Sequence, residues 1–171
     1  TNQVIYKTEI KNNHWVKASP QFFIPYRIEV VDTTNNKLLL DIKLNLFDKR
    51  VYISFESKSL GDTIAWFPYV EIFRDKHKCK MVCSTFWNDL FKNEYHNIQF
   101  EEPGSVVSNI HALYRIGIFE ENTANMNPVD TRISPLQKIA CDILGLDFNK
   151  VKPKITVQHK IKTIKKKYVC I

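Results

Sequence analysis

From residue 51 onward, stretches with the pattern of strands alternate with stretches with the pattern of helices. Residues 51–55 alternate apolar and polar side chains, and residues 64–78 have the apolar spacing of a helix. Further strands are expected over 80–83, 97–102 and 111–119. Because strand–helix alternation is typical of βαβ units, this half of the chain is predicted to form a parallel, Rossmann-like sheet.

Three helices are expected between and after these strands. Pro68 is tolerated only near a helix start, so the first helix is expected to begin properly near Trp66, after a strained turn. The second helix is expected over 86–95, with Ser84 or Thr85 as its cap. The third follows a surface loop over 120–133. It is capped by Ser134, has Pro135 in its first position and stops at Gly145.

The first 50 residues have a different rhythm, typical of antiparallel strands. Strands are expected over 4–10, 26–32 and 38–46, with a turn at 33–36, where the asparagines suit turn geometry. The predicted fold class is therefore α/β. A small antiparallel β domain (1–50) is followed by a Rossmann-like half (51–149).

The positive charge of the chain is concentrated near its end. The net charge is +7, but eight lysines and no acids lie in 148–171, so the residues before them carry −1. We interpret 150–167 as a lysine-rich linker. No aromatic platform is interleaved with the lysines, which argues against a nucleic-acid-binding role for this tail.

Cysteine usage and hydropathy indicate a cytoplasmic protein. Cys79, Cys83, Cys141 and Cys170 lie in or beside apolar runs, without the paired spacing of a zinc site, so we expect reduced thiols and no metal in this chain. No apolar run reaches the ~18 residues that a membrane span requires, and no signal peptide opens the sequence.

The turn between the first Rossmann strand and helix holds the pair Gly61-Asp62. The sequence contains no phosphate-binding loop, no GxGxxG, no HExxH and no GxSxG. Ligands bind at the carboxyl ends of parallel strands, where a carboxylate can act as a base. From the residues alone, the favoured interpretation is that Asp62 is the N-cap of the helix, with Gly61 easing the turn.

Several strings resemble one family in the order in which that family has them. They lie at 59–71, 83–88, 135–138, 142–146, 152–154 and 168–171. The first, SLGDTIAWFPYVE, is similar to the opening motif of the heptosyltransferase superfamily. Taken together, the strings resemble one family within that superfamily, the bacterial autotransporter O-heptosyltransferases. No string as specific appears before residue 51.

The resemblance implies a GT-B glycosyltransferase with two facing Rossmann-like halves. It implies that Asp62 is the general base of an inverting transfer from ADP-heptose to Ser or Thr hydroxyls of an acceptor protein, an autotransporter-like adhesin. It places the nucleotide-sugar donor site, and an iron site held by cysteines, in a second half. Residues 168–171 would be the first strand of that half. The chain by itself is therefore expected to be inactive, and a homo-oligomer or a second chain is expected to complete the site.

The remaining candidates are expected to contact substrate. They are Ser59, Gly61, Thr63, Trp66, Thr85, Phe86, Trp87 and Arg132. Each has a structural alternative. Ser59 and Thr63 could form turn or cap hydrogen bonds, Trp66 could be a core aromatic, 85–87 could be a capped helix start, and Arg132 could pair with Asp130.

Two other classes of function stay open. A chain with half of an active site could be a non-catalytic interaction or assembly module. A nucleic-acid-binding domain would have to rely on the lysine tail, because the body carries −1. A truncated parallel sheet would also leave an edge and an apolar face exposed, which predicts self-association.

Overall fold

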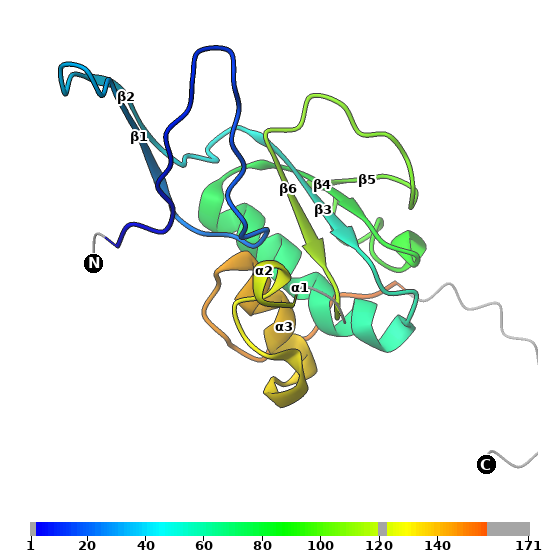
Figure 1. The fold of residues 1–171 in the computed structure, drawn as a ribbon. Helices are drawn as coiled ribbons and strands as arrows, with labels where there is room; N and C mark the ends of the chain where they lie inside the picture. The colour runs from blue at the N-terminus through cyan, green and yellow to red at the C-terminus, as the bar shows by residue number, and fades with distance from the viewer. Residues whose placement is uncertain (1–2, 120–122, 157–171) are drawn as a thin grey trace, which may run out of the picture.

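Two sheets of opposite kinds make up the strands of the protein (Figure 1). The computed structural model describes residues 3–119 and 123–156. An antiparallel ribbon pairs β1 (Arg27–Val31) with β2 (Leu38–Lys43). A parallel sheet has the strand order β5-β4-β3-β6. The α/β class, with an antiparallel unit before a parallel one, is confirmed.

The parallel sheet is built around β3. Its strands are β3 (Arg50–Phe55), β4 (Lys80–Ser84), β5 (Ile98–Phe100) and β6 (Ala112–Ile116). All of their pairings are parallel. The chain runs outward from β3 through β4 to β5, and then returns to the other side of β3 as β6. The strand order thus reverses between β3 and β6, and a reversal of this kind marks the usual ligand crevice of an open α/β sheet.

Two helices cover the same face of this sheet (Figure 1). They are α1 (Leu60–His77) and α3 (Leu136–Leu144). The Trp66 indole joins them by donating to the Leu136 carbonyl at 2.8 Å. Val51, Ile53 and Phe55 of β3 point toward the helices and are buried. On the opposite face, Leu113 of β6 is 47% exposed.

The start of α1 was predicted wrongly. The helix begins at Leu60 with Ser59 as its N-cap, so Gly61, Asp62 and Thr63 lie in its first turn instead of in a strained turn before Trp66. Pro68 lies inside the helix and is buried. Proline cannot donate the backbone hydrogen bond to residue 64, but the side-chain bonds around Ser59 stabilise the preceding turns.

Two further helix predictions need correction. In place of a helix over 86–95 there is a single short 3₁₀ turn, Asn88–Leu90, because the Asn88 side chain bonds to backbone groups on both sides of it. The loop expected over 120–133 contains α2 (Thr123–Met126) and a 3₁₀ turn, Thr131–Ile133. The start of α3 is displaced by one residue, with Pro135 at the cap, and Gly145 ends it as expected.

The N-terminal region packs on the parallel half at only a few points. The strand expected over 4–10 is absent. These residues are exposed and no neighbouring strand pairs with them. Phe22 and Phe23 pack against the core, and Leu46 is buried in it. The ribbon itself projects away from the sheet (Figure 1). The predicted domain boundary at residue 50 stays a prediction.

The first part of the expected linker also packs on the body. The Tyr69 hydroxyl donates to the Asn149 carbonyl at 2.8 Å, and the Lys154 N–H donates to the Tyr95 hydroxyl at 2.9 Å. The rest of the linker, 157–167, and the strand expected at 168–171 lie outside the described residues.

Candidate functional site

The end of β3 and the start of α1 place Asp62 at the carboxyl edge of the sheet. With Ser59 as N-cap, Asp62 is the third residue of the helix, and its N–H donates to Ser59 Oγ at 3.4 Å. The alternative that Asp62 is the N-cap is therefore wrong. The carboxylate is half-buried and lies beside the point where the strand order reverses. A carboxylate here can meet a ligand in the crevice.

Ser57 connects the strand to this carboxylate. Its hydroxyl donates to Asp62 Oδ2 at 2.5 Å and accepts the Ser59 N–H at 3.1 Å. Sequence reasoning missed Ser57. A hydroxyl two residues before a capping serine is the only signal that could have suggested it, and that signal is weak.

Gly61 is not required by the backbone conformation. It has no positive φ, and a Cβ added to it would meet only Ser59 Oγ, at 3.7 Å. A larger residue would therefore fit within the chain. What glycine provides is an open surface beside Asp62, where a substrate can come close to the helix start.

Thr63 and Trp66 point into the protein. Both are fully buried. Thr63 Oγ1 donates to the Ser59 carbonyl at 3.0 Å, and the Trp66 ring lies 6.0 Å from the Phe55 ring, between centroids. The burial of Trp66 does not fit stacking on a sugar. Both side chains act instead by holding the helix start against the sheet.

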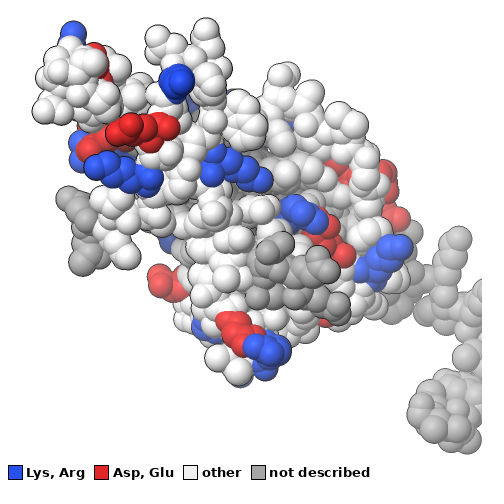
Figure 2. Space-filling model, viewed as in Figure 1, with Lys and Arg blue, Asp and Glu red and all other residues white. Residues whose placement is uncertain are grey.

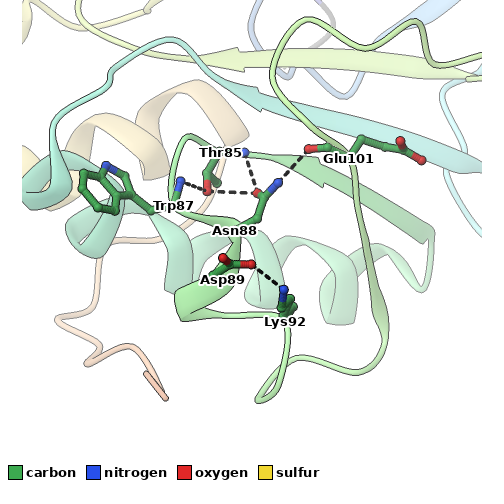
Figure 3. A network of polar contacts seen from close by, with 6 residues as sticks. All are labelled: Thr85, Trp87, Asn88, Asp89, Lys92 and Glu101. Atoms are coloured by element: carbon green, nitrogen blue, oxygen red, sulfur yellow. Dashed lines mark hydrogen bonds and ion pairs between the residues drawn. The ribbon is translucent and has the colours of Figure 1, made fainter. Parts of the chain in front are cut away.

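The segment after β4 is organised by Asn88 (Figure 3). Asn88 Oδ1 accepts both the Thr85 N–H at 2.9 Å and the Thr85 hydroxyl at 3.1 Å, while its Nδ2 donates to the Glu101 carbonyl at 2.8 Å. The Trp87 N–H donates to Thr85 Oγ1 at 3.0 Å. Thr85 is consequently buried, and its hydroxyl is fully used within the protein. Sequence reasoning missed Asn88.

Phe86 and Trp87 are displayed at the surface of the same segment and contact the Asp62 turn. They are 42% and 40% exposed. Trp87 Nε1 donates to the Lys58 carbonyl at 2.9 Å, and the Lys58 ammonium lies 5.5 Å from the centre of the Phe86 ring. The structure thus brings together the two segments that the sequence proposed, those after the first and second Rossmann strands.

Arg132 lies apart from this group. Its guanidinium donates to both oxygens of the Asp130 carboxylate, and the shortest contact, from Nη2 to Oδ2, is 2.6 Å. The Arg132 side chain is 87% exposed. The hydrogen bond with Arg132 lowers the pKa of Asp130 to about 2. In the described residues no hydrogen bond or ion pair joins Arg132 to Asp62 or to Trp87. The pairing with Asp130, given above as the alternative, is the one observed.

An ion pair lies at the same edge of the sheet as Asp62. Arg115 of β6 donates to both carboxylate oxygens of Glu56, at 3.0 and 2.9 Å, and this hydrogen bonding is the main cause that lowers the pKa of Glu56. Gly117 permits this approach, because a Cβ there would lie 3.0 Å from the Glu56 Cβ. Figure 2 shows charges of both signs interspersed over the face in view. No single-sign patch on that face suits nucleic acid.

The three described cysteines do not fit a metal site. Cys79, Cys83 and Cys141 are buried free thiols, and burial raises the pKa of Cys79 and of Cys141 to about 11, so both stay protonated near neutral pH. Over residues 3–119 and 123–156, no three His, Cys, Asp or Glu side chains gather as a metal would need. The helices of these same residues include none with the length and apolarity to span a membrane.

Known proteins similar to this chain are glycosyltransferases, and more narrowly autotransporter heptosyltransferases. BAHTCr of Citrobacter rodentium is 36% identical over 94% of this chain, and TibC of Escherichia coli O78:H11 is 35% identical over 92%. The predicted resemblance is thereby confirmed. The chain spans about 40% of the length of these relatives. No protein-family model matches it.

A solved structure gives the same result for the fold. The crystal structure of TibC, an iron-containing dodecameric glycosyltransferase, superposes with a TM-score of 0.77 at 35% identity, over 84% of this chain and 38% of TibC. A second TibC structure, in complex with ADP-D-beta-D-heptose, gives 0.76. Another relative, 29% identical, is the inactive autotransporter heptosyltransferase BimC of Burkholderia thailandensis.

Proposed function

We propose that this chain forms the N-terminal, acceptor-side part of a protein O-heptosyltransferase of the GT-B type, with Asp62 as the general base. The observation that carries the proposal is the half-buried Asp62 carboxylate at the carboxyl end of β3, held by Ser57 and next to the open surface at Gly61. Similarity to autotransporter heptosyltransferases over almost the whole chain supports the reaction class.

The reaction assigned to this site is an inverting sugar transfer in the cytoplasm. A Ser or Thr hydroxyl of an autotransporter acceptor lies against Asp62, which takes its proton. The hydroxyl oxygen forms a bond to the anomeric carbon of ADP-heptose, and the bond from that carbon to the diphosphate breaks, so ADP leaves with the electron pair. In this proposal the donor is bound by a second half; support comes from the solved relative, which binds ADP-heptose and of which this chain covers 38%.

The residues of this chain position the acceptor and the base. Gly61 leaves room for the acceptor backbone, and Phe86 and Trp87 form an aromatic wall beside it. Thr85 and Asn88 hold that wall in place. Assembly into a homo-oligomer is part of the proposal, since the TibC relative is dodecameric.

The experiment that tests the base is a matched pair of variants in the protein at its full natural length. Asp62→Asn removes the base with little change in shape, and we expect kcat to fall by about 10²–10⁴-fold, the range of a general base. Asp89→Asn is the control. Asp89 is an exposed acid after β4 whose only partner in the described residues is Lys92 (Figure 3). Transfer at the normal rate by Asp62→Asn would exclude Asp62 as the base.

A non-catalytic binding module is the second candidate, and the relative BimC, described as inactive, favours it. In this case the protein binds an acceptor or a partner subunit without transferring sugar. The two candidates differ in one measurement. If the wild-type protein at full length binds acceptor but releases no ADP from ADP-heptose, the module is correct.

A further inference from the structure

The start of α1 departs from the usual way in which an acid in the third helical position is used. In a capping box, the acid at this position accepts the N–H of the N-cap residue. Here the N-cap is Ser59 and the acid is Asp62, but the Ser59 N–H donates to Ser57 Oγ at 3.1 Å. Ser57 in turn donates to Asp62 Oδ2 at 2.5 Å. The Ser57 hydroxyl is thus inserted between the two members of the box.

This insertion leaves one oxygen of the carboxylate available. A serine hydroxyl has one proton, and Ser57 gives it to Oδ2. In the described part of the chain no group donates to Asp62 Oδ1. The carboxylate is therefore held through one oxygen while the other keeps its lone pairs for an incoming hydroxyl.

The segment that carries Ser57 is fixed from a second side. Trp87 Nε1 donates to the carbonyl of Lys58, the residue after Ser57, at 2.9 Å. The turn between β3 and α1 is thereby tied to the segment after β4. A hydroxyl on a fixed turn can hold a carboxylate in one orientation. A hydroxyl on a mobile loop would move together with the carboxylate and would not restrain it.

We propose that Ser57 is the positioning residue of the base: its hydroxyl holds Asp62 Oδ2 so that Oδ1 faces the acceptor. The proposal rests on the role of Asp62 given above. Without the Ser57 hydroxyl, both the Ser59 N–H and the carboxylate lose a partner. Asp62 then turns back to accept the Ser59 N–H as in an ordinary capping box, away from the acceptor.

The test compares Ser57→Ala with Ser57→Thr in the full-length protein, assayed with ADP-heptose and acceptor. Ser57→Ala lowers kcat by about 10- to 100-fold, the size expected when a reacting group is displaced by a fraction of an ångström to one ångström, and leaves KM unchanged. Ser57→Thr keeps a hydroxyl and restores most of kcat. Thermal unfolding of each variant shows that the compared samples are folded.

Ser54→Ala is the matched control. Ser54 also donates to a carboxylate, Glu56 Oε1 at 3.0 Å, but does not touch Asp62. Its removal is expected to leave kcat unchanged. If Ser57→Ala keeps wild-type kcat, or if Ser57→Thr falls as far as Ser57→Ala, the positioning role is wrong.

The Asp62→Asn background separates this inference from the proposed function. If Ser57 acts through Asp62, adding Ser57→Ala to Asp62→Asn causes no further loss of kcat. A further tenfold loss in that background means that Ser57 acts by another route and overturns the inference. Full activity of Asp62→Asn alone overturns the proposed function, whatever Ser57 does.

Discussion

The ribbon β1–β2 and the central strand β3 have the same alternating pattern in the sequence but opposite surroundings in the protein. In β3, Val51 and Ile53 are 0% exposed because α1 and α3 cover their face of the sheet. In the ribbon, the cross-strand pair Ile28 and Ile42 is 47% and 48% exposed. Alternation therefore indicates which side chains share a face. It does not indicate that a layer exists to cover that face.

The other face of the ribbon agrees with this interpretation. Arg27 donates to both oxygens of Asp41 across the strands, and also pairs with Glu29. The ribbon thus has a charged face, which is suited to water, and an apolar face, which is not covered by the described residues. A two-stranded ribbon by itself is at best marginally stable in water. We infer that β3 contributes far more than the ribbon to the stability of this chain.

The largest expected effect comes from an isoleucine-to-alanine substitution in β3, compared with the same substitution in the ribbon. Ile53→Ala leaves a cavity under α1 and is expected to lower the free energy of unfolding by about 2–5 kcal/mol. Ile42→Ala removes a side chain that is already half exposed, and less than about 1 kcal/mol is expected. Urea unfolding of the 171-residue chain measures both.

Equal losses for the two variants would break the comparison. They would mean that the apolar face of the ribbon is covered in solution, by another copy of the chain or by residues outside the described ones. Repeating the Ile42→Ala measurement at several protein concentrations distinguishes these cases, because only association makes the loss depend on concentration.

Local patterns predicted the strands better than the helix starts. The ribbon, all four parallel strands and α3 were expected at nearly the observed positions. Burial of one face of a strand or helix requires apolar side chains at a regular spacing, and that spacing can be read in the sequence. The start of α1 was missed because Pro68 outweighed the capping signal of Ser59. The helix predicted over 86–95 does not form, and nothing in the sequence shows that Asn88 would reach the Glu101 carbonyl.

The candidate site was predictable in part, for a related reason. Asp62 and the pair Phe86 and Trp87 follow strand ends, and parallel strands bring their carboxyl ends together. Trp66 belonged to the same string but is fully buried. Whether a residue in a motif faces solvent or core depends on how the helix is rotated about its axis. That rotation depends on which residue is the N-cap.

The second prediction concerns the point at which the N-terminal region meets the parallel half. Gly145, at the end of α3, has φ +60°, and a Cβ there would lie 2.5 Å from Phe23 Cδ1. Phe23 is fixed, since its N–H donates to the Ile143 carbonyl at 2.8 Å. Gly145→Ala is expected to lower the free energy of unfolding by about 2–3 kcal/mol, from the left-handed conformation and from displacing the ring.

Gly104→Ala is its matched control. Gly104 also has a positive φ, of 86°, but a Cβ there meets nothing within 4 Å. Only the conformational cost, about 1 kcal/mol, is expected. The difference between the two variants therefore measures the contact with Phe23. If both variants lose the same amount, the N-terminal region does not depend on this contact.

The smallest expected effect is a dependence on pH at the same junction. His77, the last residue of α1, packs against the rings of Phe23 and Phe73, at 4.8 and 4.4 Å between centroids. Burial, and secondarily the charge of Lys76, hold the pKa of His77 below its ordinary value of 6.5. In the unfolded chain the pKa returns to that value, so the unfolded state binds more protons as the pH falls below about 7. The stability that His77 provides is present above pH 6.5 and is lost progressively as the pH falls toward the lowered pKa of the folded state.

This loss is separable from the other titrations of the protein, because a histidine can be replaced by a ring that does not titrate. We expect the free energy of unfolding of the wild type to fall more between pH 8 and pH 5 than that of His77→Phe, since carboxylates that titrate in both proteins cancel in the difference. His96→Phe, at an exposed histidine, is the control for the substitution itself. A slope for His77→Phe that equals the wild-type slope would show that the His77 ring takes up protons in place, and hence that Phe23 packs too loosely to exclude water. The N-terminal region would then be no better anchored at residue 23 than it is along the exposed ribbon.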